Sequence, residues 1–338
     1  MASLANKYRP NTFEECCGQN SIVRILKRQI EIKQYKNCYL FAGPSGCGKT
    51  TIARILANNI NEFMGKPIEI DGASNNGVDN VRLIIEEARE RSLDSEYKIF
   101  IIDECHMLTI QAWNALLKII EEPPKYTIFM FCTTDPNKLP ATIINRCQRF
   151  NLTRVGIDLI KERLKFICST EGYTNFDESC DYIAKLSSGG VRDAISMLEK
   201  CAGLSTDLNI ENVLSVLGDF SYDTFFELTN NIIDGNQKSA MEIIDKCYYS
   251  GADLKLFTNQ YFDFVLDLTK YCIFKSLDVI KIPAELEKKL QYTVGIENNV
   301  NYFQQLTSRM LDIYNEIKQD TMPRTTLSAE ILRLCRGQ

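Results

Sequence analysis

Residues 43–50 read Gly43-Pro44-Ser45-Gly46-Cys47-Gly48-Lys49-Thr50, and they directly follow the apolar run Cys38-Tyr39-Leu40-Phe41-Ala42. The octapeptide matches G-x-x-x-x-G-K-[ST], in which the glycines let backbone N–H groups close around phosphate oxygens. Lys49 brings a positive charge to the terminal phosphates, and the Thr50 hydroxyl is a ligand for Mg²⁺. The apolar run predicts a buried strand, and residues 51–57 predict a helix whose N-terminus faces the phosphates. The motif and its flanks therefore predict binding of a nucleoside triphosphate, including contacts from Thr51 at the start of that helix.

The apolar pattern divides the chain into three successive regions. Strands are expected at 39–42, 68–70, 97–102 and 127–133, with helices at 78–92 and 110–121. This alternation predicts an α/β fold for residues 1–155, with a mainly parallel sheet and helices on both faces. Residues 156–218 predict a small helical region, with helices at 157–170, 178–186, 191–202 and 210–217, and Gly218 with Asp219 marks its expected end. Residues 219–338 predict about six further helices.

Composition narrows the classes of protein that the chain can represent. Its 338 residues are 45% apolar and 25% charged, as in ordinary globular proteins, and no apolar run is long enough to span a bilayer. No N-terminal targeting segment is visible, so a cytoplasmic location without membrane association is expected. The net charge of −5 argues against a strongly basic, freely sliding nucleic-acid binder but leaves a local DNA surface open.

Histidine and cysteine usage argues against several kinds of metal and catalytic site. His106 is the single histidine, which excludes histidine-based triads and multi-histidine metal sites. The thirteen cysteines never form C-x-x-C, so no zinc site is expected, and the thiols are expected to be reduced.

An acidic pair follows the strand expected at 97–102. Asp103 at a strand end is placed to hold the Mg²⁺ hydration shell, and Glu104 can polarise an attacking water as a general base. In isolation such a pair is more often a solvated loop start. Together with the phosphate loop upstream, it predicts hydrolysis as well as binding.

Three further residues are open to two interpretations. Thr134, after the strand expected at 127–133, either senses the terminal phosphate or belongs to an ordinary turn. Arg146 and Arg192 either stabilise transition-state charge on a phosphate or form surface ion pairs. The residues alone do not choose between these interpretations.

A series of motifs in family order gives the chain a resemblance to the gamma/tau ATPase subunits of the bacterial DNA polymerase III clamp loader, which are AAA+ proteins. The motifs, besides the phosphate loop, are Lys7-Tyr8-Arg9-Pro10, Gly18-Gln19, Glu69-Ile70-Asp71-Gly72-Ala73-Ser74, Ile102-Asp103-Glu104-Cys105-His106, Asn114-Ala115-Leu116-Leu117-Lys118, Glu121-Glu122-Pro123-Pro124, Thr133-Thr134-Asp135-Pro136, Asn145-Arg146-Cys147 and Gly190-Val191-Arg192-Asp193. The match is specific over residues 7 to about 200 and weaker beyond. It implies an AAA+ domain at 1–155, a helical lid at 156–218 and an all-α collar at 219–338.

The resemblance also implies roles for individual residues. Tyr8, Arg9, Pro10 and Gly18 would line the adenine pocket of ATP bound between subunits. Thr134 matches the first sensor position and Arg192 the lid sensor on the γ-phosphate, whereas Arg146 matches the arginine finger that reaches the ATP of a neighbouring subunit. A five-membered ring of such subunits would open a sliding clamp, and primer-template DNA would trigger hydrolysis and release for the replicative polymerase.

The sequence departs from the family pattern in places. Residues 58–66 are too short for the four-cysteine zinc module of bacterial members, and Asn145 replaces the usual serine of the finger motif. The chain ends after the expected collar, as in a short gamma-like form, and either a bacterial or a phage source fits. The resemblance also implies DNA contacts, for which the polar helix starts around Ser74, Asn75, Asn76 and Thr109 are candidates, and a solvated loop is the alternative at each of these residues.

Three alternative functions are also compatible with the sequence. A branch-migration helicase shares the phosphate loop and the acidic pair but not the 114–124 stretch. A replication factor C small subunit usually has Asn at the first sensor position, where this chain has Thr134. A ring scaffold that binds ATP without hydrolysing it would need neither Glu104 nor Arg146.

Overall fold

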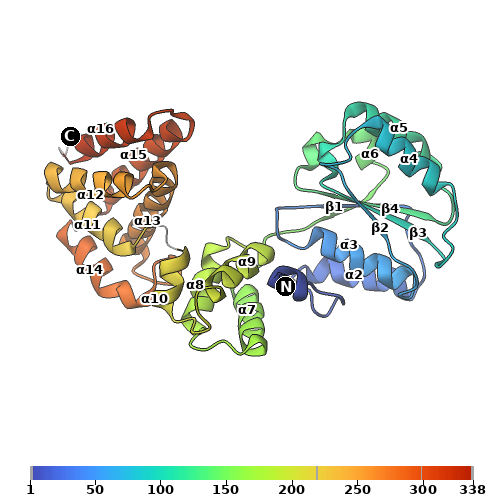
Figure 1. Cartoon of the computed structure of the whole chain (residues 1–338), viewed down its shortest axis with the longest axis horizontal. Coiled ribbons are helices and arrows are strands. Elements are labelled where there is room, and N and C mark those ends of the chain that lie inside the picture. Colours follow the sequence, from blue (N-terminus) through green and yellow to red (C-terminus); the bar gives the residue numbers. More distant parts are fainter. Residues whose placement is uncertain (1–2, 218–219, 298, 336–338) are drawn as a thin grey trace. The chain divides into compact units, whose positions relative to one another are not determined.

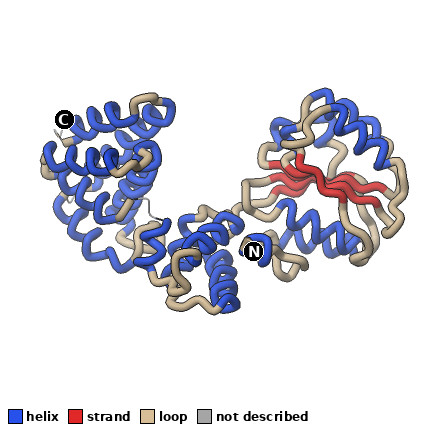
Figure 2. The backbone as a smooth tube through the Cα atoms, in the orientation of Figure 1, coloured by secondary structure: helices blue, strands red, loops and turns tan. Residues whose placement is uncertain are grey.

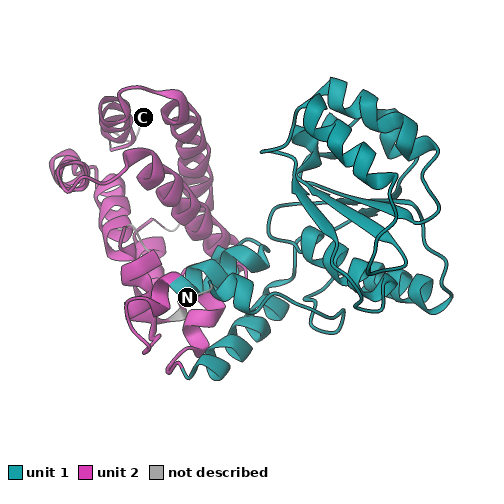
Figure 3. Cartoon of the chain, turned by 45° about the vertical axis from the view of Figure 1, so that its right-hand side comes forward, with its two compact units in different colours: residues 1–172, 183–199 teal, residues 173–182, 200–338 magenta. Residues whose placement is uncertain are grey.

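The computed structural model describes residues 3–217, 220–297 and 299–335. These residues form two compact units (Figure 3): residues 1–172 with 183–199, and residues 173–182 with 200–338. The expected end of the lid at Gly218 and Asp219 lies outside the described residues. The division into three domains therefore stays a prediction.

A five-stranded parallel sheet forms the centre of the first unit (Figure 2). In chain order its strands are β1 (Cys38–Ala42), β2 (Ile68–Asp71), β3 (Lys98–Asp103), β4 (Thr127–Thr133) and β5 (Gln148–Asn151), and in space they follow the order β2-β3-β4-β1-β5. All four strand pairs are parallel. The carboxyl ends of β1, β3 and β4 therefore meet at one edge of the sheet, where α/β proteins commonly bind ligands.

Helices cover both faces of this sheet (Figure 1). The helices α2 (Asn20–Glu31) and α3 (Lys49–Ile60) cover one face, and α4 (Val78–Ala88), α5 (Ile110–Glu121) and α6 (Ala141–Ile144) cover the other. Alternate residues of a strand point to opposite faces, so Tyr39 and Phe41 of β1 enter the core under α3 while Leu40 enters the core under α5. This arrangement confirms the predicted α/β fold.

From residue 3 to residue 202, the described part of the chain contains four α-helices besides those that cover the sheet. α1 (Leu4–Lys7) precedes α2, and α7 (Ile157–Glu171) follows β5. The structure also contains α8 (Asp177–Leu186) and α9 (Val191–Ala202), close to the ranges predicted from sequence. Residues 183–199, including most of α9, belong to the first unit.

The described part of the second unit is helical. Its elements after α9 are α10 (Ile210–Leu217), α11 (Tyr222–Ile233), α12 (Gln237–Tyr249), α13 (Leu254–Phe274), the 3₁₀ turn η3 (Ala284–Leu286), α14 (Glu287–Ile296), α15 (Val300–Gln319) and α16 (Pro323–Leu334). Large aromatic side chains, including Phe257, Tyr261 and Phe303, fill its core. Across both units, none of the helices described is long and apolar enough to cross a membrane.

Candidate nucleotide-binding site

The phosphate loop joins β1 to α3, and its glycines are required by the local backbone. Gly46 and Gly48 have φ values of 71° and 100°, in the left-handed region that favours glycine. A Cβ on Gly46 would also lie 3.2 Å from Asp193 Oδ2, and Val191 N donates to Gly46 O over 3.1 Å. The start of α9 therefore packs directly against the loop.

Lys49 lies at the first position of α3 and is almost fully buried, with 6% of its surface exposed. Its Nζ donates to Gly43 O over 3.0 Å and to Pro44 O over 2.9 Å. A buried ammonium group needs polar partners, and two neutral carbonyls leave its positive charge without a counter-charge in these contacts. The loop thus combines the buried positive charge of Lys49 with glycines in the left-handed backbone conformation. This combination suits the binding of an anionic phosphate.

The two predicted magnesium ligands contact each other. Thr50 Oγ1 donates to Asp103 Oδ2 over 2.7 Å, which brings the start of α3 and the end of β3 together. The other carboxylate oxygen, Asp103 Oδ1, accepts a hydrogen bond from Glu104 N over 3.0 Å. A hydroxyl and a carboxylate at this distance offer oxygen donors of the kind that Mg²⁺ prefers.

Glu104 directly follows β3 and has an unusual backbone conformation. Its φ of 44° and ψ of 42° lie in the left-handed region, which costs a non-glycine residue roughly 1–2 kcal/mol. Its Oε2 accepts a hydrogen bond from Thr134 Oγ1 over 3.2 Å. Backbone strain of this kind is concentrated at functional sites. Here the strained residue is Glu104, the predicted general base, which directly follows Asp103.

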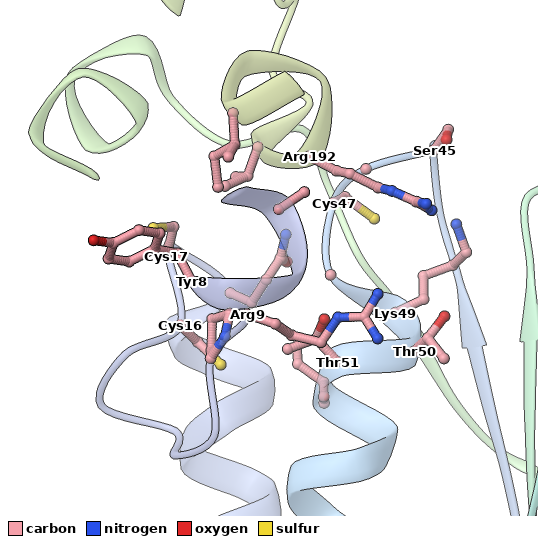
Figure 4. A pocket seen from close by; sticks show the side chains of 18 of the residues that line it. Tyr8, Arg9, Cys16, Cys17, Ser45, Cys47, Lys49, Thr50, Thr51 and Arg192 are labelled. Atoms are coloured by element: carbon pink, nitrogen blue, oxygen red, sulfur yellow. The ribbon is translucent and has the colours of Figure 1, made fainter. Parts of the chain in front are cut away.

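A pocket opens beside the loop and brings together most of the residues predicted to hold the nucleotide (Figure 4). Arg192 extends from α9 toward the loop segment that carries Ser45 and Lys49. The predicted residues that line the pocket are Tyr8, Arg9, Pro10, Ser45, Gly46, Cys47, Gly48, Lys49, Thr50, Thr51, Asp103, Glu104 and Arg192.

Several lining residues were not predicted from sequence. They are Ala5, Cys16, Cys17, Gln19, Ile52, Arg163, Val191 and Ile195. Arg163 Nη2 donates to Tyr8 O over 2.7 Å, and Lys7 Nζ lies 2.6 Å from Glu171 Oε1. These contacts fasten the N-terminal segment to α7, but they join residues more than 150 positions apart, so no local sequence signal could reveal them.

Five predicted residues do not line this pocket: Gly18, Gly43, Pro44, Thr134 and Arg146. Gly43 and Pro44 still hold Lys49 through their carbonyls, and Thr134 contacts Glu104. Gly18 lies next to Val155, whose Cγ1 would be 3.7 Å from an added Cβ. Arg146 lies in a different groove, together with Glu121 and Glu122.

The thiols at the pocket are poor nucleophiles. Burial raises the pKa of Cys47 above its ordinary value, and burial followed by the charge of Cys17 raises the pKa of Cys16 to about 12. A thiol with a raised pKa stays protonated at neutral pH, and the thiolate is the reactive form. The site is therefore unsuited to covalent catalysis by these cysteines.

The parallel sheet, the phosphate loop and the acidic strand end define an AAA+ nucleotide-binding fold. The fold resembles that of the Thermotoga maritima RuvB Holliday junction branch migration motor, with a TM-score of 0.53 at 22% identity over 73% of this chain and 86% of that one. Two family models match the sequence: "DNA polymerase III, delta subunit" over residues 66–156 and "DNA polymerase III subunits gamma and tau domain III" over residues 208–337.

Relatives from bacteria identify the family. The DNA polymerase III subunit gamma of Buchnera aphidicola subsp. Acyrthosiphon pisum is 34% identical over 74% of this chain and 75% of its own. The subunit tau of Bacillus subtilis is 33% identical over 99% of this chain, and subunit gamma/tau of Mycoplasma genitalium is 32% identical over 86%. This chain belongs to the DNA polymerase III gamma/tau family, which confirms the resemblance read from the motifs. It spans 63% of the Bacillus subtilis relative and 52% of the Mycoplasma genitalium relative.

Proposed function

We propose that this chain is an ATPase subunit of a DNA replication clamp loader. In this role it binds and hydrolyses ATP to open a sliding clamp and place it on primer-template DNA for the replicative polymerase. One observation carries the proposal: in a member of the gamma/tau family, the Thr50–Asp103 contact of 2.7 Å lies beside the buried Lys49 and the strained Glu104. A subunit that only shaped a ring would need none of these costly arrangements.

Each residue of the pocket has a role in this proposal. The loop N–H groups and Lys49 bind the phosphates, and Thr50 and Asp103 hold Mg²⁺, partly through water. When bound, ATP supplies the reactive γ-phosphate, and Mg²⁺ neutralises part of the phosphate charge. Glu104 accepts the proton of the attacking water, and Arg192 stabilises charge on the phosphate from the α9 side of the pocket.

The position of Arg146 supports assembly into a ring. It does not line the pocket of its own chain, as expected for a residue that acts on the nucleotide of a neighbour. We therefore include the other clamp-loader subunits, in a five-membered ring, among the proposed partners. A cytoplasmic location belongs to the same proposal, in keeping with free thiols at all thirteen cysteines.

The proposed DNA surface gains support from the loops before α4 and α5. Thr109 N donates to Asn76 O over 3.1 Å, so the two polar helix starts lie side by side. Thr109 Oγ1 also caps α5 by accepting from Ala112 N over 3.2 Å. Adjacent helix N-termini attract phosphate groups without a net positive charge.

A branch-migration motor is the second candidate, because the solved RuvB structures share the fold. Their sequence identity to this chain is only 22%, so the likeness supports the fold alone. The match of residues 208–337 to the gamma and tau domain III model favours the clamp loader over this motor and over a replication factor C subunit.

The test is ATP hydrolysis by the purified complex alone, with its clamp, with primed DNA, and with both. Synergistic stimulation by clamp and primed DNA together is expected. Stimulation by DNA alone would favour the translocating motor, and tight binding without turnover in every mixture would favour the scaffold.

A further inference from the structure

His106 contacts the predicted general base, Glu104, but has no role in the proposed hydrolysis. It belongs to the 3₁₀ turn η1 (Cys105–Met107), and its side chain is only 12% exposed. Its Nδ1 lies 3.3 Å from Glu104 Oε2 and 3.2 Å from Thr133 Oγ1. The left-handed turn at Glu104 folds the chain back, so that the side chains of Glu104 and His106, two positions apart in the sequence, lie together.

The partners of Nδ1 determine where the imidazole carries its proton. A carboxylate oxygen can only accept a hydrogen bond, so Nδ1 must carry hydrogen to contact Glu104 favourably. Thr133 Oγ1 already accepts from Asp135 N over 3.0 Å and has a second lone pair for the imidazole. The consistent assignment is an Nδ1–H group shared between Glu104 Oε2 and Thr133 Oγ1.

The contacts on Glu104 are unevenly distributed between its two oxygens. Oε2 accepts a hydrogen bond from Thr134 Oγ1 over 3.2 Å and lies 3.3 Å from His106 Nδ1. Oε1 accepts no hydrogen bond from any residue that the structure describes. A carboxylate fixed through one oxygen leaves the other available to a water molecule, and such orientation of a base is a large part of its efficiency.

We propose that His106 is a positioning residue for hydrolysis: together with Thr134 it holds Glu104 through Oε2, so that Oε1 faces the attacking water. Thr133, fully buried at the end of β4, anchors the imidazole in turn. The inference rests on the proposed ATPase function. It assigns His106 no part in proton transfer, because its N–H is engaged by Glu104 and Thr133.

Nuclear magnetic resonance tests the geometry without relying on activity. Because the chain has one histidine, every imidazole ¹⁵N signal belongs to His106, and only its Nδ1 and Nε2 need to be told apart. At pH 8 we expect the Nδ1–H tautomer in the unmodified protein and its loss in Glu104→Ala. An Nε2–H tautomer in the unmodified protein would overturn the proposal.

A pair of variants tests the effect on catalysis. His106→Asn keeps an N–H donor close to the position of Nδ1, whereas His106→Leu removes it. We expect His106→Leu to lower kcat about 10- to 100-fold, the effect of losing one hydrogen bond to a charged group, with the KM for ATP unchanged. His106→Asn is expected to recover most of this loss.

The outcomes separate this inference from the proposed function. Equal rates for the Leu and Asn variants, whether both fast or both slow, would overturn the positioning role. Absence of hydrolysis by the unmodified complex with clamp and primed DNA would instead overturn the ATPase proposal, while the tautomer measurement would still report on the contact. ATP affinity and the thermal melting temperature of each variant show whether it is folded.

Discussion

Arg146 and Glu121 form an ion pair, with 2.6 Å between Nη2 and Oε1. The Nη1 of the same guanidinium donates to Thr142 O over 2.7 Å, so the side chain folds back onto α6. Both side chains are partly exposed, at 38% and 46%, and exposed pairs contribute about 0–1 kcal/mol. The predicted finger is therefore held within its own chain by an interaction that a neighbouring phosphate can readily replace.

Replacing Glu121 with Gln should release Arg146 at little cost. We expect Glu121→Gln to raise the ATP turnover of the assembled complex by up to about fivefold, the equivalent of a pair worth up to about 1 kcal/mol. The measurement is steady-state hydrolysis across a range of subunit concentrations. Glu122→Gln is the matched control, because Glu122 lines the same groove. A large loss of turnover in Glu121→Gln alone would show that the pair supports the finger instead of restraining it.

Lys49 is expected to be essential for binding. Lys49→Ala removes the buried charge of the phosphate loop and should weaken ATP binding by about 100-fold or more, the loss of two or three charged hydrogen bonds. Titration calorimetry measures the effect directly. The exposed Lys66→Ala is the control and should bind as the unmodified protein does. Binding of ATP by Lys49→Ala with undiminished affinity would mean that the nucleotide occupies another site.

Most of the nucleotide-binding half could be predicted because its signals are local. The phosphate loop, the apolar strands and the acidic strand end each lie within a few consecutive residues, and the parallel sheet follows from their alternation with helices. β5 was missed, since in Gln148–Asn151 only Phe150 is buried and the strand lies at the sheet edge. An edge strand of this kind has no continuous apolar run to reveal it.

The contacts that complete the site could not be predicted. Arg163 reaches Tyr8 across 155 positions, and His106 reaches Glu104 only because of a left-handed turn. Neither contact leaves a periodic pattern in the sequence.

The helix predicted at 78–92 was too long, because α4 ends at Ala88 and a loop follows.

Glu104→Gln should separate binding from hydrolysis. The amide cannot accept a proton from water, so we expect kcat to fall by about 10²- to 10⁴-fold while ATP remains bound. Single-turnover measurements with radiolabelled ATP would detect the trapped nucleotide. Glu90→Gln, an exposed substitution of the same kind, should leave turnover unchanged. Turnover close to normal in Glu104→Gln would assign the base to another residue.

A carboxyl pair in the second unit predicts a pH dependence of stability. A shared hydrogen bond with Glu178 and then burial raise the pKa of Glu285 to about 7. Because the folded pKa lies above the ordinary 4.5, the folded state holds the proton more tightly, so stability should fall as pH rises from about 4.5 to 7.

Denaturant unfolding of the chain at intervals from pH 4.5 to 8 measures this dependence. Glu285→Gln keeps a hydrogen-bond donor without a titrating proton and should flatten the curve over that range. The exposed Glu242→Gln should leave the curve as it is. An equal slope in both variants would show that Glu285 does not cause the pH dependence.

Arg146→Ala should slow hydrolysis by about 10³-fold if the residue acts as a finger. Mixing tests whether it acts between subunits: Arg146→Ala chains keep their own base, and Glu104→Gln chains keep their finger. A mixed complex places intact bases next to intact fingers, so it should hydrolyse ATP faster than either variant alone, with a maximum at an intermediate ratio. The control uses Arg24→Ala, on the exposed side of α2, in place of Arg146→Ala. A complex of Arg24→Ala chains alone should lose little activity. Rates that fall on a straight line between the two variants would mean that Arg146 serves its own chain.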